Sequence, residues 1–184
     1  MRIIAGNAKG TRLASLGKAE LRPTLDRVRE SVFNILSPRI QGSSWLDLFA
    51  GTGAVSMEAV SRGAARAVMV EPNRAVQEII LKNRVSCKFD DSNLVLLKLE
   101  AARAMHKLEA AKESFDVVYV DPPFADGLYE PTLNALGEGT LLKNDAWVLV
   151  EHFHKQELAG NYGRLTEFDM RRMGDTTVSF FALE

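Results

Sequence analysis

Short apolar segments alternate with helical segments through the middle of the chain, and this alternation constrains the fold most strongly. The predicted strands are 45–49, 66–71, 93–97, 115–120 and 146–151. The predicted helices pass through 57–60, 73–86, 100–112 and 128–136. Strands that alternate with helices form parallel sheets with right-handed crossovers. The sequence therefore predicts an α/β fold around a mostly parallel sheet.

The C-terminal third carries no comparable helix. Residues 162–170 and 176–183 are predicted strands that turn at Gly174-Asp175. This hairpin adds at least one antiparallel strand to the sheet.

The N-terminal segment is predicted to form a small extension of its own. Residues 2–6 and 11–14 predict a hairpin, and a helix follows with Thr24 as its N-cap. Pro38 and Gly42 are expected to end that helix. We therefore divide the chain into an extension, residues 1–40, and a main domain, residues 41–184.

The charge distribution sets the extension apart from the main domain. The whole chain has a net charge of −1, which argues against a bulk nucleic-acid binder. Residues 1–40 nevertheless hold eight Lys or Arg against three acids, whereas the remainder holds 15 basic and 21 acidic residues. A basic segment on an acidic body indicates a face for phosphates, although a solvated basic surface explains the charge equally well.

Asp47 ends the first strand of the main domain and precedes the loop Ala50-Gly51-Thr52-Gly53. Glycines let backbone N–H groups at a helix start approach a ligand closely. A dinucleotide-binding turn would place a third glycine where Ser56 stands. An acid before the glycines would repel a pyrophosphate but suits S-adenosylmethionine, which carries an ammonium and a sulfonium. A plain tight turn is the alternative.

Two further acids end the next two strands. Glu71 lies one βα unit after Asp47, where an acid can accept hydrogen bonds from both hydroxyls of a ribose. Glu100 can accept from an adenine amine, or it can simply be an acid at a helix start.

Asp121-Pro122-Pro123-Phe124 follows the fourth strand. Two prolines fix an extended loop and leave the Pro122 carbonyl free to accept from an amine, as Asp121 can also do. Phe124 offers a ring on which a base can stack. Exocyclic amines of bases are poor nucleophiles, so orienting the nitrogen lone pair toward a methyl donor is the main task of such a loop. A rigid loop with a packed Phe is the alternative.

Other chemistries find little support. The single cysteine, Cys87, excludes an internal disulfide, and no segment is long and apolar enough for a membrane span. His152 and His154 share a strand face without further ligands in zinc-binding spacing, so we expect solvated histidines and no metal. The N-terminus lacks a signal-peptide layout, so we expect a cytoplasmic protein.

With these residues in hand, the chain resembles the class I S-adenosylmethionine methyltransferases and, more narrowly, the bacterial 16S ribosomal RNA guanine-N2-methyltransferases. The resemblance rests on RIIAG with Lys9-Gly10, LRPTLDRVRE at 21–30, LDLFAGTG at 46–53 and DPPF at 121–124. It implies a Rossmann-like, seven-stranded sheet that is mostly parallel and closes with an antiparallel hairpin. Family members usually have Asp where Glu100 stands and often Tyr where Phe124 stands.

The resemblance completes the predicted site. Together with the residue patterns above, it implies that S-adenosylmethionine is the cofactor, and we expect Asp47, Phe49, Gly51, Gly53, Glu71 and Glu100 to hold it. The target amine is positioned by Asp121, Pro122 and Phe124, and RNA is contacted by Lys9, Arg12, Arg22, Arg27 and Arg29. We expect a monomer that methylates a guanine N2 of 16S rRNA, with the assembled small subunit as its partner. DNA adenine-N6 methylation and a cofactor-binding assembly factor without turnover are the alternatives.

Overall fold

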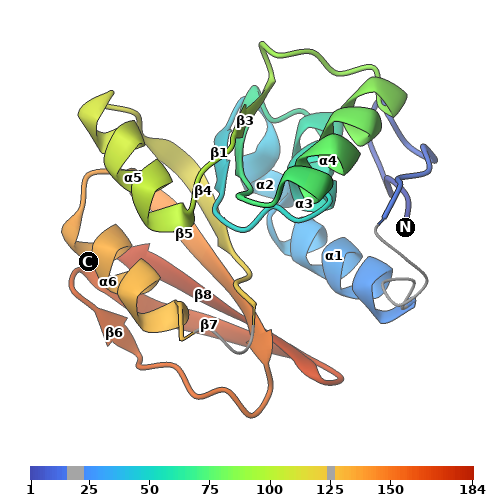
Figure 1. Ribbon diagram of the computed structural model, residues 1–184. Helices are drawn as coiled ribbons and strands as arrows, with labels where there is room; N and C mark the ends of the chain where they lie inside the picture. The colour runs from blue at the N-terminus through green and yellow to red at the C-terminus, as the bar shows by residue number, and fades with distance from the viewer. Residues whose placement is uncertain (16–22, 124–126) are drawn as a thin grey trace.

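The computed structural model describes residues 1–15, 23–123 and 127–184. One sheet organises the molecule (Figure 1). Its strands are β1 (Ser44–Asp47), β2 (Arg66–Val70), β3 (Leu94–Leu97), β4 (Phe115–Val120), β5 (Leu142–Phe153), β6 (Asn161–Tyr162), β7 (Leu165–Met173) and β8 (Thr176–Leu183). The helices are α1 (Pro23–Ile35), α2 (Ser37–Ile40), α3 (Ala54–Ser61), α4 (Arg74–Ser86), α5 (Ala101–Ala110) and α6 (Tyr129–Glu138).

The strand order confirms the predicted topology. It runs β3-β2-β1-β4-β5-β8-β7-β6, with β1 to β5 parallel and β8, β7 and β6 antiparallel to their neighbours. The two-residue strand β6 at the edge brings the described sheet to eight strands, one more than the predicted seven. The order reverses between β1 and β4, and ligands of open α/β sheets bind beside such a switch point.

Helices cover both faces of the parallel half of the sheet (Figure 1). The helices α1, α3 and α4 lie on one face, and α5 and α6 lie on the other. Burial on both faces explains why β4 is apolar over nearly its whole length. In the core between the sheet and the helices α1, α3 and α4, the large side chains of Trp45 and Phe33 stack with their ring centroids 5.3 Å apart.

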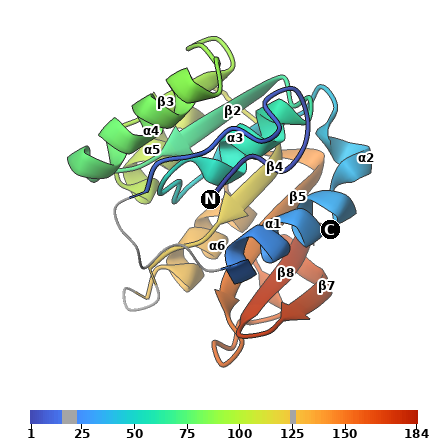
Figure 2. The same ribbon diagram turned by 90° about the vertical axis from the view of Figure 1, so that its right-hand side faces the viewer.

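The N-terminal segment runs over α3 on the α1 side of the sheet (Figure 2). The predicted pairing of residues 2–6 with 11–14 is present but shorter than predicted: Arg2 and Arg12 form one antiparallel bridge, flanked by backbone hydrogen bonds between the two segments. The backbone N–H groups of Ile4 and Ala5 donate to the carboxylate of Glu58, at 2.8 and 3.0 Å. Glu58 is fully buried in α3, so these bonds attach the segment to that helix.

The first helix also differs in detail from its prediction. It begins at Pro23, so the predicted N-cap Thr24 lies inside its first turn. Pro38 does not end the helical region but stands near the start of the short helix α2. Proline fits the first turn because the N–H that it lacks has no partner there.

Candidate active site

A cavity of about 220 Å³ opens at the carboxyl ends of β1, β4 and β5. The end of β1, the loop that follows it and the start of α3 form one wall, through Asp47, Phe49, residues 50–52 and residues 54–55. Tyr119, Asp121 and Glu151 contribute from β4 and β5, and Met1 and Arg29 contribute from the extension. The cavity therefore combines the predicted cofactor loop with the predicted amine-binding loop.

Three carboxylates line this cavity from three neighbouring strands. Asp47 is level with Tyr119 in the β1–β4 register, and Tyr119 is level with Leu149 in the β4–β5 register. Asp121 and Glu151 lie two residues beyond that level, so all three acids are on the same face of the sheet. Asp47 consequently lies deeper, while Asp121 and Glu151 flank each other nearer the rim.

Asp47 is a buried carboxylate with only one of its two oxygens hydrogen-bonded to another side chain. Its side chain is 2% exposed, and Oδ2 accepts from the Ser56 hydroxyl at 2.9 Å. The other oxygen, Oδ1, is buried without a hydrogen-bond partner among the described residues. Burial raises the pKa of Asp47 to about 7, against hydrogen bonds from Ser56 and the Phe49 backbone that lower it. A buried, partly unsatisfied carboxylate of this kind is suited to a cationic ligand.

The glycine loop has the backbone form that the sequence predicted. Gly51 and Gly53 adopt φ values of +50° and +78°, which side chains disfavour. A Cβ on Gly53 would also approach Met57 Cε at 3.0 Å. Nothing lies within 4 Å of a Cβ on Gly51, so its backbone borders open space at the cavity wall.

The two remaining predicted cofactor acids differ in setting. Glu71 is 9% exposed and accepts from the backbone N–H groups of Asn73, at 2.8 Å, and Gly51. Burial raises the pKa of Glu71, and the nearby charge of Glu100 raises it further. Glu100 itself is exposed at the start of α5 and lines a neighbouring hollow together with Phe49. Phe49 therefore borders both spaces.

The amine-binding loop places Asp121 beside a second acid. Asp121 is half-buried, and burial together with the charges of Glu151 and Asp47 raises its pKa well above the ordinary value. Pro122 is buried, and no backbone N–H of the described residues donates to its carbonyl. Phe124 lies outside the described residues.

Glu151 and Tyr119 belong to this site although sequence analysis did not select them. The Tyr119 hydroxyl donates to Glu151 Oε2. Burial raises the pKa of Tyr119, and the charge of Glu151 adds to this, so the hydroxyl remains a donor. The sequence carried a signal for Glu151, because it ends the strand predicted over 146–151 just as Asp121 follows the strand predicted over 115–120.

The structure corrects the expected role of Arg29. This side chain is 7% exposed and lines the cavity instead of projecting toward solvent. Its guanidinium donates to the Arg2 carbonyl and to Asp26 Oδ1, and it forms an ion pair with Glu58 at 3.8 Å. An outward contact with RNA phosphates is therefore ruled out for Arg29 in this conformation.

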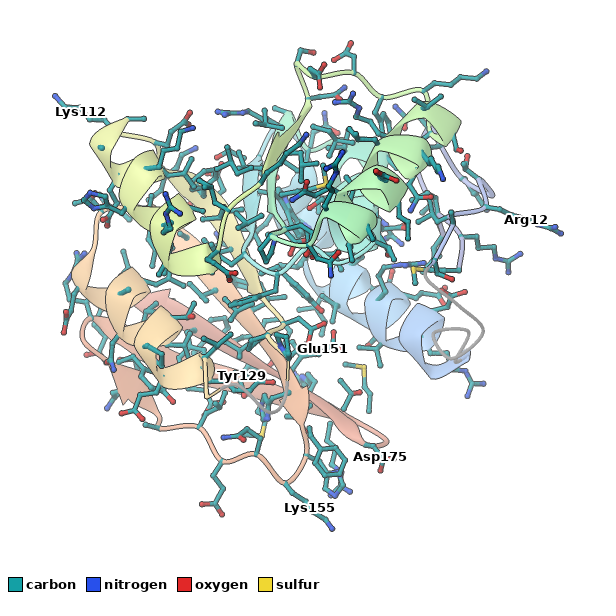
Figure 3. The ribbon with its side chains drawn as sticks, viewed as in Figure 1. Arg12, Lys112, Tyr129, Glu151, Lys155 and Asp175 are labelled. Carbon is teal, nitrogen blue, oxygen red and sulfur yellow. The ribbon has the colours of Figure 1, made fainter. Side chains whose placement is uncertain are left out.

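The other predicted RNA contacts remain on the surface. Lys9, Arg12 and Arg27 are exposed, and Arg12 projects outward from the N-terminal segment (Figure 3). Lys9 and Arg27 border a hollow of about 370 Å³ between that segment and α1. Arg22 lies outside the described residues.

The strand-end histidines also differ from expectation. His152 is buried, and its Nε2 lies 3.1 Å from the Ser179 hydroxyl, so it is a packed residue and not a solvated one.

This sheet order, with a cavity beside the loop after β1, is the fold of methyltransferases. A structure described as a putative methyltransferase yhhF from Escherichia coli superimposes with a TM-score of 0.82 at 35% identity, covering 100% of this chain and 98% of that one. The chain belongs to the family described as Conserved hypothetical protein 95, whose model matches residues 1–182.

Two curated relatives have more specific names. Ribosomal RNA small subunit methyltransferase D of Escherichia coli (strain K12) is 40% identical over 151 residues, which cover 82% of this chain and 74% of the relative. Putative rRNA methyltransferase YlbH of Bacillus subtilis (strain 168) is 30% identical over 182 residues, which cover 98% of each chain. No helix within the described parts of the chain is long and apolar enough to cross a membrane.

Proposed function

We propose that this chain transfers a methyl group from S-adenosylmethionine to the exocyclic N2 of a guanine in 16S ribosomal RNA. The observation that carries the proposal is the cavity in which a deep carboxylate, Asp47, lies below a rim of two more, Asp121 and Glu151. Relatives that carry names of ribosomal RNA methyltransferases support the substrate class.

The residues present fit the cofactor. S-adenosylmethionine supplies an activated methyl group when bound, and it brings two positive charges and one carboxylate. Within the part of the chain that the structure describes, the buried Oδ1 of Asp47 has no hydrogen-bond partner and the space beside Gly51 is open, so this wall can receive a cationic group. Arg29, which borders the same cavity, is suited to hold the carboxylate. We assign the ribose hydroxyls to Glu71, and the adenine to the side of Phe49 and Glu100.

Asp121 and the Pro122 carbonyl would orient the amine of the target base. Both are acceptors, so they would hold the two N–H bonds and direct the nitrogen lone pair at the methyl group. A bound cation lowers the pKa of Asp121, which counteracts the neighbouring carboxylates that raise it. With the cationic cofactor bound, Asp121 would therefore be ionised. It could then accept the proton that the amine loses when the methyl group passes from sulfur to nitrogen.

The exposed cations of the extension would guide the RNA. Lys9, Arg12 and Arg27 lie on the surface of the same extension that contributes Met1 and Arg29 to the cavity. Their number is small and the whole chain has a net charge of −1, so binding to naked RNA would be weak. We therefore propose that the substrate is the assembled small subunit. We also propose that the enzyme acts in the cytoplasm as a monomer.

Mass spectrometry of nucleosides tests the proposal. Protein-free 16S rRNA and small subunits that lack the modification are incubated with the protein and isotopically labelled S-adenosylmethionine. We expect label in N2-methylguanosine, with particles methylated faster than free RNA. Label in N6-methyladenosine would replace guanine by adenine as the target, and binding of the cofactor without transfer to any RNA would indicate an assembly factor.

A further inference from the structure

Glu151 is a carboxylate at the rim of the cavity whose role the assignments above leave open. It lies in β5, one residue beyond the last β4–β5 pair, Val120 with Val150, and Asp121 is one residue beyond the same pair on the β4 side. Neighbouring parallel strands are about 4.8 Å apart, so the two carboxylates can contact two neighbouring polar groups on one edge of a planar base.

The fold holds Glu151 at two points. The Tyr119 hydroxyl donates to Oε2, and the Tyr129 hydroxyl at the start of α6 donates to the backbone carbonyl at 3.2 Å. Figure 3 labels both residues and shows Tyr129 at the start of α6. A side chain fixed in this way is preorganised for one direction of hydrogen bonding.

One oxygen of this carboxylate remains available. Among the described residues no group donates to Glu151 Oε1, and no Lys or Arg forms an ion pair with it. A half-buried carboxylate oxygen without a donor or a cationic partner is free to accept a hydrogen bond from a ligand.

We propose that Glu151 accepts the N1–H of the target base and thereby selects guanine over purines that carry a lone pair at N1. This inference rests on the proposed methyl transfer to guanine N2. The guanine amine is flanked by N1, which carries a hydrogen, and by N3, which does not. A carboxylate can accept only from N1, so the base enters with its N1 side toward Glu151 and its amine toward Asp121.

The same geometry disfavours adenine. The adenine amine is flanked by N1, which has a lone pair, and the loop Asp121-Pro122-Pro123 alone does not discriminate between the two amines. A lone pair placed against the Glu151 carboxylate is repelled and leaves that charge unpaired. The second acid at the rim therefore supplies the specificity that the proline loop lacks.

The test separates recognition of N1 from acceptance of the methyl group. Small subunits are reconstituted with 16S rRNA that carries either guanine or 2-aminopurine at the position that the wild-type protein methylates. 2-Aminopurine keeps the amine but has a lone pair at N1. Initial rates of methyl transfer are compared for the wild type, for Glu151→Gln, and for Glu138→Gln as a matched control at the exposed end of α6.

We expect the wild type and Glu138→Gln to prefer guanine over 2-aminopurine by about 100-fold or more. Glu151→Gln should lose about 10- to 100-fold in kcat/KM on guanine, the effect of one charge-assisted hydrogen bond. Its preference should fall below about tenfold, because a glutamine amide can rotate and donate to N1 of 2-aminopurine. Affinity for S-adenosylhomocysteine, measured by calorimetry, should stay within about threefold of the wild type.

Four results would overturn the inference. Equal losses on both bases would make Glu151 a general electrostatic element, and a large loss of S-adenosylhomocysteine affinity would move it into the cofactor site. A wild type that already uses 2-aminopurine as well as guanine would show that N1 is not recognised. If the wild type methylates no guanine at all, the proposed function itself fails, and the inference fails with it.

Discussion

Replacing Asp47 by asparagine removes the most deeply buried charge of the cavity and keeps the size of the side chain. The pKa of Asp47 is about 7 in the folded protein against an ordinary value of 3.8. The folded state therefore holds this proton more tightly than the unfolded state does. The stabilisation that the proton provides is complete below about pH 4 and is lost as the pH rises through about 7.

These pKa values set the size of the effect. The cost of ionising Asp47 on folding is about 1.5 kcal/mol at pH 5 and about 4 kcal/mol at pH 8. Asparagine has no such cost. The free energy of unfolding of Asp47→Asn, relative to the wild type, should therefore rise by about 2.5 kcal/mol between pH 5 and pH 8.

Urea unfolding of both proteins without cofactor, at pH 5 and pH 8, measures this difference. Contributions that do not depend on pH, such as the altered hydrogen bond with Ser56, cancel between the two pH values. Asp145→Asn is the matched control, because the Asp145 side chain is 79% exposed. The stabilised Asp47 variant should bind S-adenosylmethionine at least about tenfold more weakly at pH 8. A relative stability that is the same at both pH values would refute the reasoning from a buried charge.

Three further predictions test other parts of the site. Asp121→Ala should abolish methyl transfer while affinity for S-adenosylmethionine, measured by calorimetry, stays within about tenfold; a larger loss of affinity would place Asp121 in the cofactor site. Gly6→Ala should lower the free energy of unfolding by about 2 kcal/mol or more in urea titrations, because its Cβ would lie 1.7 Å from the Ser61 carbonyl oxygen and its φ is +83°. Unchanged stability would show that the extension is not docked as described. Replacing both Lys9 and Arg27 by glutamine should reduce the slope of log binding constant against log salt by about 1.4 for single-stranded RNA, measured by fluorescence anisotropy, with unfolding unchanged; an unaltered slope would remove both residues from the RNA path.

The sequence alone determined the class of fold, because periodicity and strand ends are local properties. Apolar segments that alternate with helices require a sheet covered on both faces; β1 to β4 lie within two residues of the predicted segments, and β5 extends the predicted 146–151 at both ends. The turn at Gly51 and Gly53 was equally predictable, since the positive φ values there favour glycine.

Only the tertiary structure decided which side chains share the cavity and which charges are buried. Glu151 is 30 residues after Asp121 in the chain, and it becomes its neighbour only through the β4–β5 register. Arg29 has the sequence context of a surface cation, but the buried carboxylate of Glu58 and the Arg2 carbonyl draw it inward. Glu58 likewise accepts hydrogen bonds from the backbone N–H groups of Ile4 and Ala5, and this contact holds the short N-terminal hairpin against α3. Long-range contacts of this kind depend on the desolvation of buried charges, which a linear pattern of residue types does not record.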